Sequence, residues 1–442
     1  MGLNSLRIRL AGAAPAPVFV VCGLGGRERV VDLYAEPGLQ VYSTPRHAGV
    51  LLVVGRLTRG LVAPALQAHD QMASPRLVVR WTAADGDDPG DHGDVFPNAV
   101  VAHGSAAEVA AAVAAAHREL LAGDRPPSAA LLADIEPAPW QGVGPYGTGG
   151  TGMTGGVPFG RPMAARAADR DDLELDQLKL RLGPLLPSLP SGLVLDVALQ
   201  GDVVQSAAVG DNPYRLYAGD PVPAAPAPGL FERACHQPVR IAELERARAR
   251  HHLRWAAGLA RLVGLEALGV RLTTLSARLA ASEESAQAER LLTRIGRSRW
   301  VAGTFAGGDL DDAGLAGLGP VARAAGSGED ARSHDPAYRA LGFEPVMGEG
   351  GDTPGRVRQR LAEAVQALRL ATAAGDATTT VSGVVEGPRG RLGRGAPPPS
   401  AALVDLVAGV VEGLEWGDAV AAIASLDLDV EEAARHPQMA MP

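Results

Sequence analysis

The chain has few of the residue types on which metal clusters, disulfide frameworks and nucleic-acid surfaces depend. Its 442 residues include two cysteines, Cys22 and Cys235, too few for a disulfide framework or for an iron–sulfur cluster ligated by four thiolates. Acidic residues outnumber basic ones by 50 to 41, giving a net charge of −9. This balance argues against nucleic-acid binding and against electrostatic adsorption to anionic lipid.

Long apolar runs are also missing. The best ones, Val18–Cys22 and Val50–Val54, are as long as strands, whereas a membrane helix needs about 20 residues. Met1–Leu10 lacks the apolar stretch of a signal peptide. We therefore expect a cytoplasmic protein of about two to three domains. Aromatic residues make up only 4%, so Ala, Val and Leu must fill its core.

The first 126 residues have the pattern of an α/β domain. Apolar runs predict buried strands and the segments between them predict helices, which implies a parallel sheet covered by helices. The predicted strands are 18–21, 50–54, 77–79 and 100–101, and the predicted helices are 27–34, 61–72 and 106–121.

Residues 127–170 are rich in glycine and proline. Nine of the nineteen residues from Gly142 to Gly160 are glycine, which is typical of a flexible linker. The alternative is a phosphate-binding loop. That loop requires a preceding strand and usually a Gly-Lys-Ser/Thr sequence, and we find neither here.

Residues 171–442 predict an α+β domain with a small antiparallel sheet and a mainly helical body. Alternation over 173–182, with a bulge at Asp176-Gln177, and over 193–204 predicts two strands. Apolar spacing predicts helices over 241–262, 353–375 and 404–414, and we expect Thr353-Pro354 to be the N-cap and first-turn pair of the second helix.

The first glycine cluster matches half of a dinucleotide-binding motif. Cys22-Gly23-Leu24-Gly25-Gly26 follows a predicted strand, but Glu28 stands where the third glycine of G-x-G-x-x-G belongs. Because that glycine lets strand and helix pack closely, the cluster indicates a tight strand–helix turn rather than a nucleotide site.

Other polar groups do not indicate an active site. His251 and His252 are adjacent without an i+4 partner, so we expect a surface or interface position. Cys235-His236 lacks a third, orienting group. His69-Asp70 and the acidic cluster Asp85–Asp94 fit solvated faces or turns.

Several short patterns in order resemble the small, cluster-bearing subunit of respiratory complex I and of membrane-bound [NiFe] hydrogenases. They cover about residues 15–122. The matching pieces are Thr44-Pro45-Arg46-His47-Ala48-Gly49, Val50–Gly55, Thr58-Arg59, Ala63-Pro64-Ala65, His69-Asp70-Gln71-Met72 and Pro75.

Most of residues 171–436 resembles the large subunit of the same assemblies. Glu245, Arg248, His252, Leu253 and Trp255 match its E-x-x-R-x-x-x-H-L-x-W helix. Further matches are Gly183-Pro184, Asp335-Pro336, Gly351-Asp352, Arg356, Arg360, Glu363, Glu386-Gly387-Pro388-Arg389-Gly390, Ser425-Leu426-Asp427 and Arg435. The resemblance implies a fusion of both subunits, with a flavodoxin-like sheet in 1–126, a linker in 127–170 and a hydrogenase large-subunit-like fold in 171–442.

The resemblance also implies that the cofactor ligands are degenerate. Of the four cysteines that hold a [4Fe–4S] cluster in the small subunit, two belong to the turn that here reads Cys22-Gly23-Leu24-Gly25, and the others fall near Ala83 and Ser105. Cys235 is a lone remnant of the first nickel-binding Cys-x-x-Cys pair, and the C-terminal pair is absent from Ser425–Glu431. The quinone-binding H-P-x-x-H-G loop reads Leu186-Pro187-Ser188-Leu189-Pro190-Ser191.

We therefore expect a non-redox structural or coupling subunit, without cofactors, on the inner face of the cell membrane. Its partners would be membrane-embedded, ion-translocating subunits. Two alternatives stay open: an active subunit that binds quinone or carries electrons, and a free-standing nucleotide- or small-molecule-binding protein. The family positions near the expected junction of the two halves, where buried Arg–Glu pairs would join them, are Arg248, His252, Glu386, Arg389 and Arg435.

Overall fold

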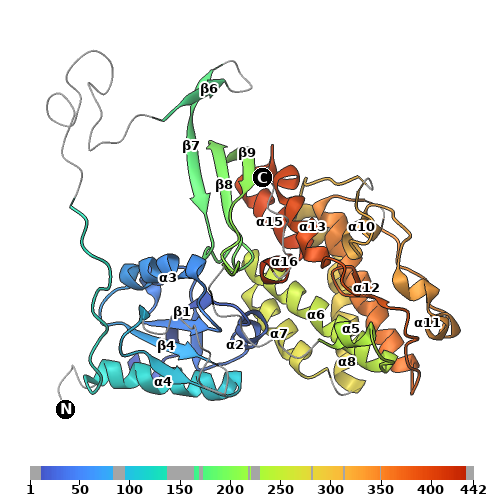
Figure 1. Cartoon of the computed structure of the whole chain (residues 1–442), viewed down its shortest axis with the longest axis horizontal. Coiled ribbons are helices and arrows are strands. Elements are labelled where there is room, and N and C mark those ends of the chain that lie inside the picture. The colour runs from blue at the N-terminus through green and yellow to red at the C-terminus, as the bar shows by residue number, and fades with distance from the viewer. Residues whose placement is uncertain are drawn as a thin grey trace.

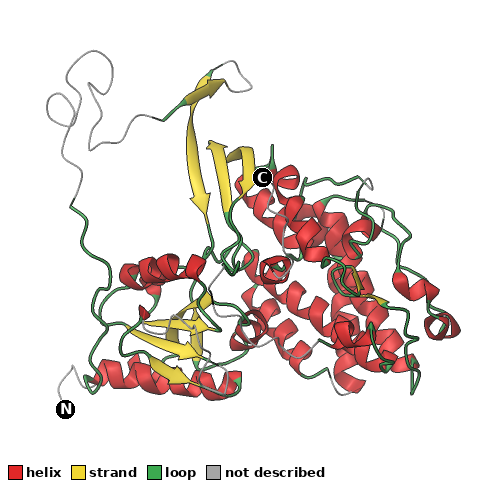
Figure 2. Ribbon diagram, viewed as in Figure 1, coloured by secondary structure: helices red, strands yellow, loops and turns green. Residues whose placement is uncertain are grey.

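The structure is a computed structural model that describes residues 11–82, 95–136, 164–168, 173–217, 220, 229–279, 282–311, 314–348 and 350–434. A parallel α/β unit lies beside a larger helical unit, and an antiparallel sheet rises from the region where they meet (Figures 1 and 2). None of the described helices has both the length and the apolar character needed to cross a bilayer. The glycine-rich stretch 142–160, the acidic cluster Asp85–Asp94, Ala83 and Arg435 lie outside the described residues.

The N-terminal unit is built on a five-stranded parallel sheet with the strand order β2-β1-β3-β4-β5. This is one of the common doubly wound orders, and the predicted parallel α/β fold is confirmed; the closer likeness to flavodoxin stays a prediction. Each predicted strand is present, and β2 is an additional three-residue strand. The strands are β1 (Ala16–Cys22), β2 (Leu39–Val41), β3 (Val50–Val54), β4 (Leu77–Trp81) and β5 (Val100–Ala102).

Helices cover both faces of this sheet. Since neighbouring strand residues point to opposite faces, the Val/Leu runs of the central strands supply two apolar layers. Val18, Leu52 and Val79 pack towards α2 (Arg27–Leu33) and α4 (Ala106–Ala122). Phe19, Leu51 and Val78 pack towards α3 (Arg59–Gln71) and the second unit. The view in Figure 1 shows the sheet between α3 and α4.

The antiparallel sheet has four strands in the order β6-β7-β8-β9. They are β6 (Arg166–Ala168), β7 (Glu174–Leu182), β8 (Leu195–Gln200) and β9 (Val203–Val209). The run 193–204 is therefore two strands, because Gly201, with φ of +62°, lies in the turn that reverses the chain. β6 falls within the range predicted as linker.

The predicted bulge at Asp176-Gln177 is wrong. β7 pairs with β8 without interruption from Gln177 to Leu182, and the residues before Gln177 pair with β6 instead. The register shift lies between Ala198 and Leu199, where β8 meets β9. The change in alternation along β7 thus marks a change of partner strand.

The helical body is organised around α6 (Ile241–Leu262) and α12 (Thr353–Ala373), which pack against each other and against α7 (Glu266–Ala277) and α8 (Ser282–Gly296). The N-cap of α12 is Asp352, whose carboxylate accepts from the Gly355 N–H, so Thr353-Pro354 is the first helical pair and the predicted cap is off by one residue. The predicted helix 404–414 is broken at Leu406 into α13 (Pro399–Asp405) and α14 (Val407–Val411).

The remaining elements are short or complete the edges of this body. They are the 3-10 helices η1 (Pro45–His47) and η5 (Ala331–His334), the hairpin β10 (Val384–Glu386) and β11 (Arg391–Gly393), and the helices α5 (Leu230–Ala234), α9 (Arg299–Thr304), α10 (Pro320–Ala324), α11 (Pro336–Ala340), α13 (Pro399–Asp405), α14 (Val407–Val411), α15 (Trp416–Leu426) and α16 (Val430–Ala434).

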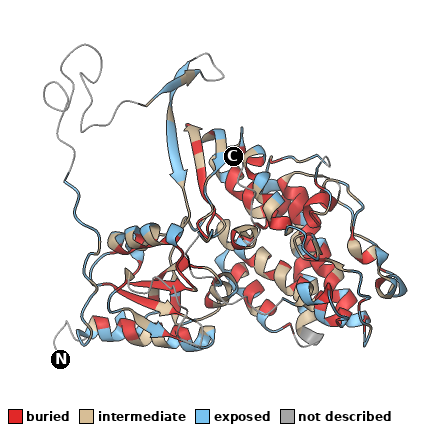
Figure 3. Ribbon diagram, in the orientation of Figure 1, coloured by how far each residue is buried: buried red, intermediate tan, exposed pale blue. Residues whose placement is uncertain are grey.

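One hydrophobic core runs through both units. It contains residues of the parallel sheet and α3, of the antiparallel sheet, and of the C-terminal helices. Figure 3 shows buried segments on both sides of the boundary, whereas β7 is largely exposed. Examples from the two sides of this core are Phe19, Val21, Leu57 and Leu61, and Leu189, Leu193, Tyr214 and Leu428.

Candidate functional site

The turn after β1 is shaped by three glycines. A Cβ on Gly23 would lie 2.4 Å from the Arg56 carbonyl oxygen, and a Cβ on Gly26 would lie 2.2 Å from the Val54 carbonyl oxygen. Gly25 has a φ of +74°, a conformation that glycine adopts without strain. The turn therefore lies directly against the loop that follows β3, with no room for larger side chains at positions 23 and 26.

The thiol of Cys22 faces protein on every side. It is 6% exposed, and its Sγ donates to the Gly23 carbonyl at 3.8 Å. Burial raises the pKa of this thiol to about 11. The carbonyl of Cys22 accepts from the Tyr214 hydroxyl at 3.0 Å.

The turn binds the C-terminal segment of the helical unit. The Gly25 N–H donates to Glu431 at 2.9 Å, and Arg27 Nη1 donates to the Leu428 carbonyl at 2.5 Å. The same guanidinium forms ion pairs with Asp429 at 3.2 Å and Asp427 at 3.6 Å. We call this set of contacts the interdomain clasp.

The loop that resembles a quinone-binding loop is packed against the same turn. Leu189 is 6% exposed within the shared core. The ring of Tyr214 is also buried. It lies so close to Gly192 that a Cβ added to this glycine would be 2.2 Å from a ring carbon. Side chains of this chain thus fill the space between loop and turn.

The residues present do not fit the [4Fe–4S] cluster that the resemblance implies. Gly23 has no space for a cysteine side chain in this backbone. Ser105 is the N-cap of α4, with its Oγ bonded to Glu108 at 2.8 Å. Across the described ranges, no group of three or more His, Cys, Asp or Glu side chains is arranged to hold a metal ion.

A buried group of seven charged residues lies within the helical unit, and we call it the Arg323 cluster. Each member is at most 3% exposed. Arg323 lies at its centre and binds three carboxylates: Glu363 through two N–H···O bonds of 2.8 Å, Glu386 at 2.8 Å and Asp330 at 3.1 Å. The cluster consists of Arg248, Arg323, Arg332, Glu245, Asp330, Glu363 and Glu386.

The remaining bonds extend the cluster towards α6. Arg332 pairs with Asp330 at 2.8 Å and with Glu245 at 3.3 Å. Glu245 also accepts from Arg248 at 3.2 Å and from the Tyr338 hydroxyl at 2.7 Å. The guanidinium of Arg248 further donates to the Glu386 and Gly387 carbonyls at 2.6 and 2.8 Å. Since buried charges require such partners, this network fixes α6, α10, η5, α12 and β10 to one another.

A second charged group, the Asp427 cluster, connects the helical unit to the clasp. Asp427 is 5% exposed and contacts His251 at 2.5 Å, Arg360 at 3.3 Å and Arg389 at 3.8 Å. Burial alone would raise the pKa of Asp427, but His251, Arg389 and Arg360 hold it far below the usual range. Burial lowers the pKa of His251 in turn. Arg389 also reaches Asp429 at 3.4 Å, the carboxylate that pairs with Arg27.

The predicted surface or interface position is wrong for His252. It is 1% exposed inside α6, and neither ring nitrogen has a hydrogen-bond partner. Burial, followed by the charges of His251 and Arg360, lowers its pKa well below the ordinary value, so the ring is neutral. His251 is partly buried and binds Asp427.

His69-Asp70 likewise does not form a solvated face. His69 is fully buried, and its Nδ1 lies 2.7 Å from Asp70. Asp70 accepts from the N–H groups of Leu131 and Leu132 at 3.0 and 2.7 Å, so the pair attaches the start of the predicted linker to α3.

The expectation that buried Arg–Glu pairs at the family positions join the two halves is wrong for Arg248 and Glu386, because their partners Glu245 and Arg323 lie in the same helical unit. Arg248 and Glu386 belong to the Arg323 cluster, and Arg389 belongs to the Asp427 cluster. His252 lies on α6 near charged residues of both clusters. Arg435 is outside the described residues. The central Arg323, together with Asp330 and Arg332, was not singled out by sequence reasoning, because Pro320–Ala324 and Ala331–His334 are too short to show a helical pattern.

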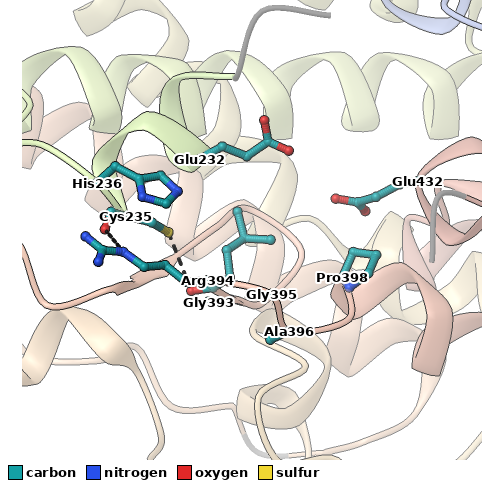
Figure 4. A pocket seen from close by; sticks show the side chains of 10 residues that line it. Glu232, Cys235, His236, Gly393, Arg394, Gly395, Ala396, Pro398 and Glu432 are labelled. Atoms are coloured by element: carbon teal, nitrogen blue, oxygen red, sulfur yellow. Dashed lines mark hydrogen bonds between the residues drawn. The ribbon is translucent and has the colours of Figure 1, made fainter. Parts of the chain in front are cut away.

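A cavity of about 360 Å³ lies beside Cys235. Glu232, Cys235 and His236 line one side, and Glu432 approaches from the other (Figure 4). Cys235 Sγ is within 3.7 Å of the Phe231 carbonyl, and the Cys235 carbonyl accepts from Arg394 Nε at 3.0 Å. Burial raises the pKa of this thiol as well, which leaves it a weak nucleophile.

Comparisons with known proteins point to one family over part of the chain. The family model described as the respiratory-chain NADH dehydrogenase 49 Kd subunit matches residues 286–393, about a quarter of the sequence. This region contains Arg323, Asp330, Arg332, Glu363 and Glu386, five of the seven members of the Arg323 cluster. No curated protein gives a significant match.

Among solved structures, the chain is similar to a chain of the membrane-bound sulfane sulfur reductase, an archaeal respiratory membrane complex. The identity is 15% and the TM-score 0.41, over 59% of this chain and 99% of that chain. The resemblance of the helical unit to the 49 Kd subunit lies in residues 286–393.

Proposed function

We propose that this protein is a non-redox structural or coupling subunit of a membrane-associated assembly related to complex I and to energy-converting hydrogenases. The observation that carries the proposal is the packing at the Cys22 turn. Where the resemblance implies a cluster and a quinone, this chain has the buried thiol of Cys22, the ring of Tyr214 and the interdomain clasp. These groups join the two halves of the chain.

The family match supports the choice of assembly. Residues 286–393 resemble the 49 Kd subunit, and the buried charges within that region hold the helical body in shape. A subunit of this kind binds through its surface to membrane-embedded, ion-translocating partners on the inner face of the membrane. In this proposal the fusion of a small-subunit-like and a large-subunit-like half makes the scaffold a single polypeptide, without resident [4Fe–4S] or nickel–iron cofactors.

An active oxidoreductase subunit is the second candidate. The cavity beside Cys235, with His236, Glu232 and Glu432 around it, is the observation in its favour. A nucleotide-binding protein has less support, because Glu28 at the end of the glycine turn accepts a 2.5 Å hydrogen bond from Arg254 of the helical unit.

The proposal is tested by purification from solubilised membranes with an affinity tag. We expect antiporter-like membrane subunits to co-purify in fixed stoichiometry. Anaerobically prepared, reduced protein should give no cluster signal in electron paramagnetic resonance and no stoichiometric iron or nickel. About four irons per chain would refute the non-redox function, and a monomer that never associates with membrane subunits would refute the assembly.

Cys22→Ser serves as the matched variant. Because Cys22 is the lone thiol of the turn, the substitution should leave metal content, visible absorbance and partner binding unchanged. Loss of a redox activity in this variant would mean that the turn still holds a cofactor.

A further inference from the structure

The Arg323 cluster contains four carboxyl groups but only three guanidinium groups. All seven residues are at most 3% exposed, and a buried charge without a counter-ion is strongly unfavourable. Arg360, also buried on α12, directs its N–H groups to Asp427 and to the carbonyls of Ser425 and Leu426. Within the cluster, the charges balance when one carboxyl group is protonated.

Three of the four carboxyl groups each have at least two guanidinium N–H groups bonded or paired to them. Glu363 accepts two bonds from Arg323 and one from Gln359 at 2.7 Å. Asp330 accepts two bonds from Arg332, at 3.0 and 2.8 Å, and lies 3.1 Å from Arg323. Paired charged N–H donors of this kind stabilise the ionised form of a carboxyl group. Glu245 has two guanidinium partners and the Tyr338 hydroxyl.

Glu386 has weaker support for a negative charge. Its Oε1 accepts from Arg323 Nη1 at 2.8 Å, but that same nitrogen lies 3.1 Å from Asp330 and 3.2 Å from the Glu329 carbonyl. Its Oε2 accepts from the Ala331 backbone N–H at 3.2 Å. An ionised Glu386 would thus have only two donors: one guanidinium group that it shares with Asp330, and one neutral backbone N–H.

We propose that Glu386 is a buried proton-binding site, whose carboxyl group holds a proton at neutral pH and releases it in alkaline solution. On release the O–H bond breaks, its electron pair stays on the carboxylate, and the proton passes to water. Burial raises the pKa of Glu386, and the neighbouring charge of Arg323 only partly opposes this. In Glu363 the balance is reversed, because the charge and bonds of Arg323 outweigh burial and hold its pKa far below the usual range.

A cavity of about 80 Å³ beside Glu386 provides a place for that water; a cavity needs only about 10–15 Å³ to admit one molecule. Charged and titratable groups surround Glu386 and this cavity. They are Arg323 on α10, Asp330 before η5, Arg332 and His334 on η5, Asp335 before α11, Tyr338 on α11, Arg248 on α6 and Arg391 across the hairpin. Glu363 on α12 shares Arg323 with Glu386.

The proposed proton site is formed by residues of this chain alone. A scaffold with such a site can take up and release a proton without redox chemistry, which would suit a coupling subunit. Its failure would leave the proposed assembly intact, and failure of the assembly would leave the proton site intact.

The test is infrared spectroscopy of the purified full chain at neutral pH. We expect the C=O stretch of a protonated carboxyl group, shifted by deuterium exchange and by ¹³C labelling of glutamate, and lost at alkaline pH. Glu386→Gln should abolish the band while unfolding at nearly the same urea concentration as the wild type, because the amide mimics a neutral carboxyl. Glu363→Gln, at the same guanidinium, should retain the band and unfold at a clearly lower urea concentration.

Three outcomes overturn the proposal. The first is a wild-type spectrum without a protonated glutamate band. The second is a band that persists in Glu386→Gln or follows aspartate labelling. The third is a Glu386→Gln chain as unstable as Glu363→Gln. If Glu386→Gln fails to fold, the labelled wild-type spectrum still decides the presence of the proton.

Discussion

At the scale of single residues, the buried arginines of the helical unit are its most vulnerable points. Arg323 is fully buried and bonds to Glu363, Glu386 and Asp330. Arg323→Leu would leave those carboxyl groups without their shared cation. We expect a loss of about 3–5 kcal/mol in the free energy of unfolding, as for other broken buried pairs, measured by urea denaturation at neutral pH.

An exposed arginine of the same region provides the control. Arg391 pairs with Glu329 at 2.9 Å, but its side chain is 51% exposed. Arg391→Leu should change the free energy of unfolding by less than about 1 kcal/mol, the range of surface ion pairs. Equal costs for the two substitutions would mean that the Arg323 cluster contributes no more than a surface pair.

Residue-level prediction from the sequence succeeds where a motif names the residue and fails where the partner is distant. The resemblance identified Arg248 and Glu386, whose contact spans more than a hundred residues, but nothing in their local sequences predicts that contact. Arg323 and Asp330 have no periodic context. The surface or interface position predicted for His252 is wrong, because adjacent histidines on an arginine-rich helix suggest a polar face. The packing of α12 against α6, which buries His252, is not visible in the local sequence.

At the scale of elements, the turn after β1 is determined by backbone contact. Gly23→Ala would place a methyl group 2.4 Å from the Arg56 carbonyl, so the turn or the β3 loop must move. We expect a loss of about 1–3 kcal/mol, as for other overpacked sites, together with a weaker clasp, because the Gly25 N–H would no longer point at Glu431.

A glycine in α6 is the matched control for this prediction. Gly258 is exposed in mid-helix, and an added methyl group would have no atom within 4 Å of it. Gly258→Ala should stabilise the protein by about 0.5–1 kcal/mol through helix propensity. Both changes are measured by urea denaturation, and a neutral Gly23→Ala would show that the turn adapts without cost.

Elements with long apolar runs were predictable from the sequence. Very short strands, and strands that change partner along their length, were not. β1, β3 and β4 each contain an apolar run, because side chains are buried on both faces of the parallel sheet. β2 has three residues and no such run. The sequence of β7 alone suggested a bulge, because it does not show that the strand pairs first with β6 and then with β8.

At the scale of the whole molecule, the shared hydrophobic core makes the two units one folding unit. Leu57 and Leu61 of the first unit and Leu189 and Tyr214 of the second are buried in the same cluster. We expect the slowest-exchanging amides of β3 and of α12 to report the same unfolding free energy in native-state hydrogen exchange. A markedly lower value for β3 would show that the α/β unit opens alone.

The stability of the interdomain clasp depends on pH, because Asp429 must be ionised to pair with Arg27 and Arg389. Burial would raise the pKa of Asp429, but Arg27 and Arg389 hold it at about 2, below the unfolded value of about 3.9. A depressed pKa in the folded state adds stability that is fully present above the unfolded pKa and is lost as the pH falls through the folded pKa. The clasp should therefore weaken between about pH 4 and pH 2.

Asp429→Asn tests this directly, because the amide keeps the shape and removes the charge. We expect the variant to be less stable than the wild type by about 2 kcal/mol at neutral pH, with the difference shrinking to nearly zero at about pH 2, as measured by urea denaturation across that range. Asp176→Asn, at an ion pair with Arg166 in which both side chains are about half exposed, should show almost no difference at any pH. If the Asp429 variant kept a constant deficit down to pH 2, its loss would come from packing rather than from the charges that hold the two units together.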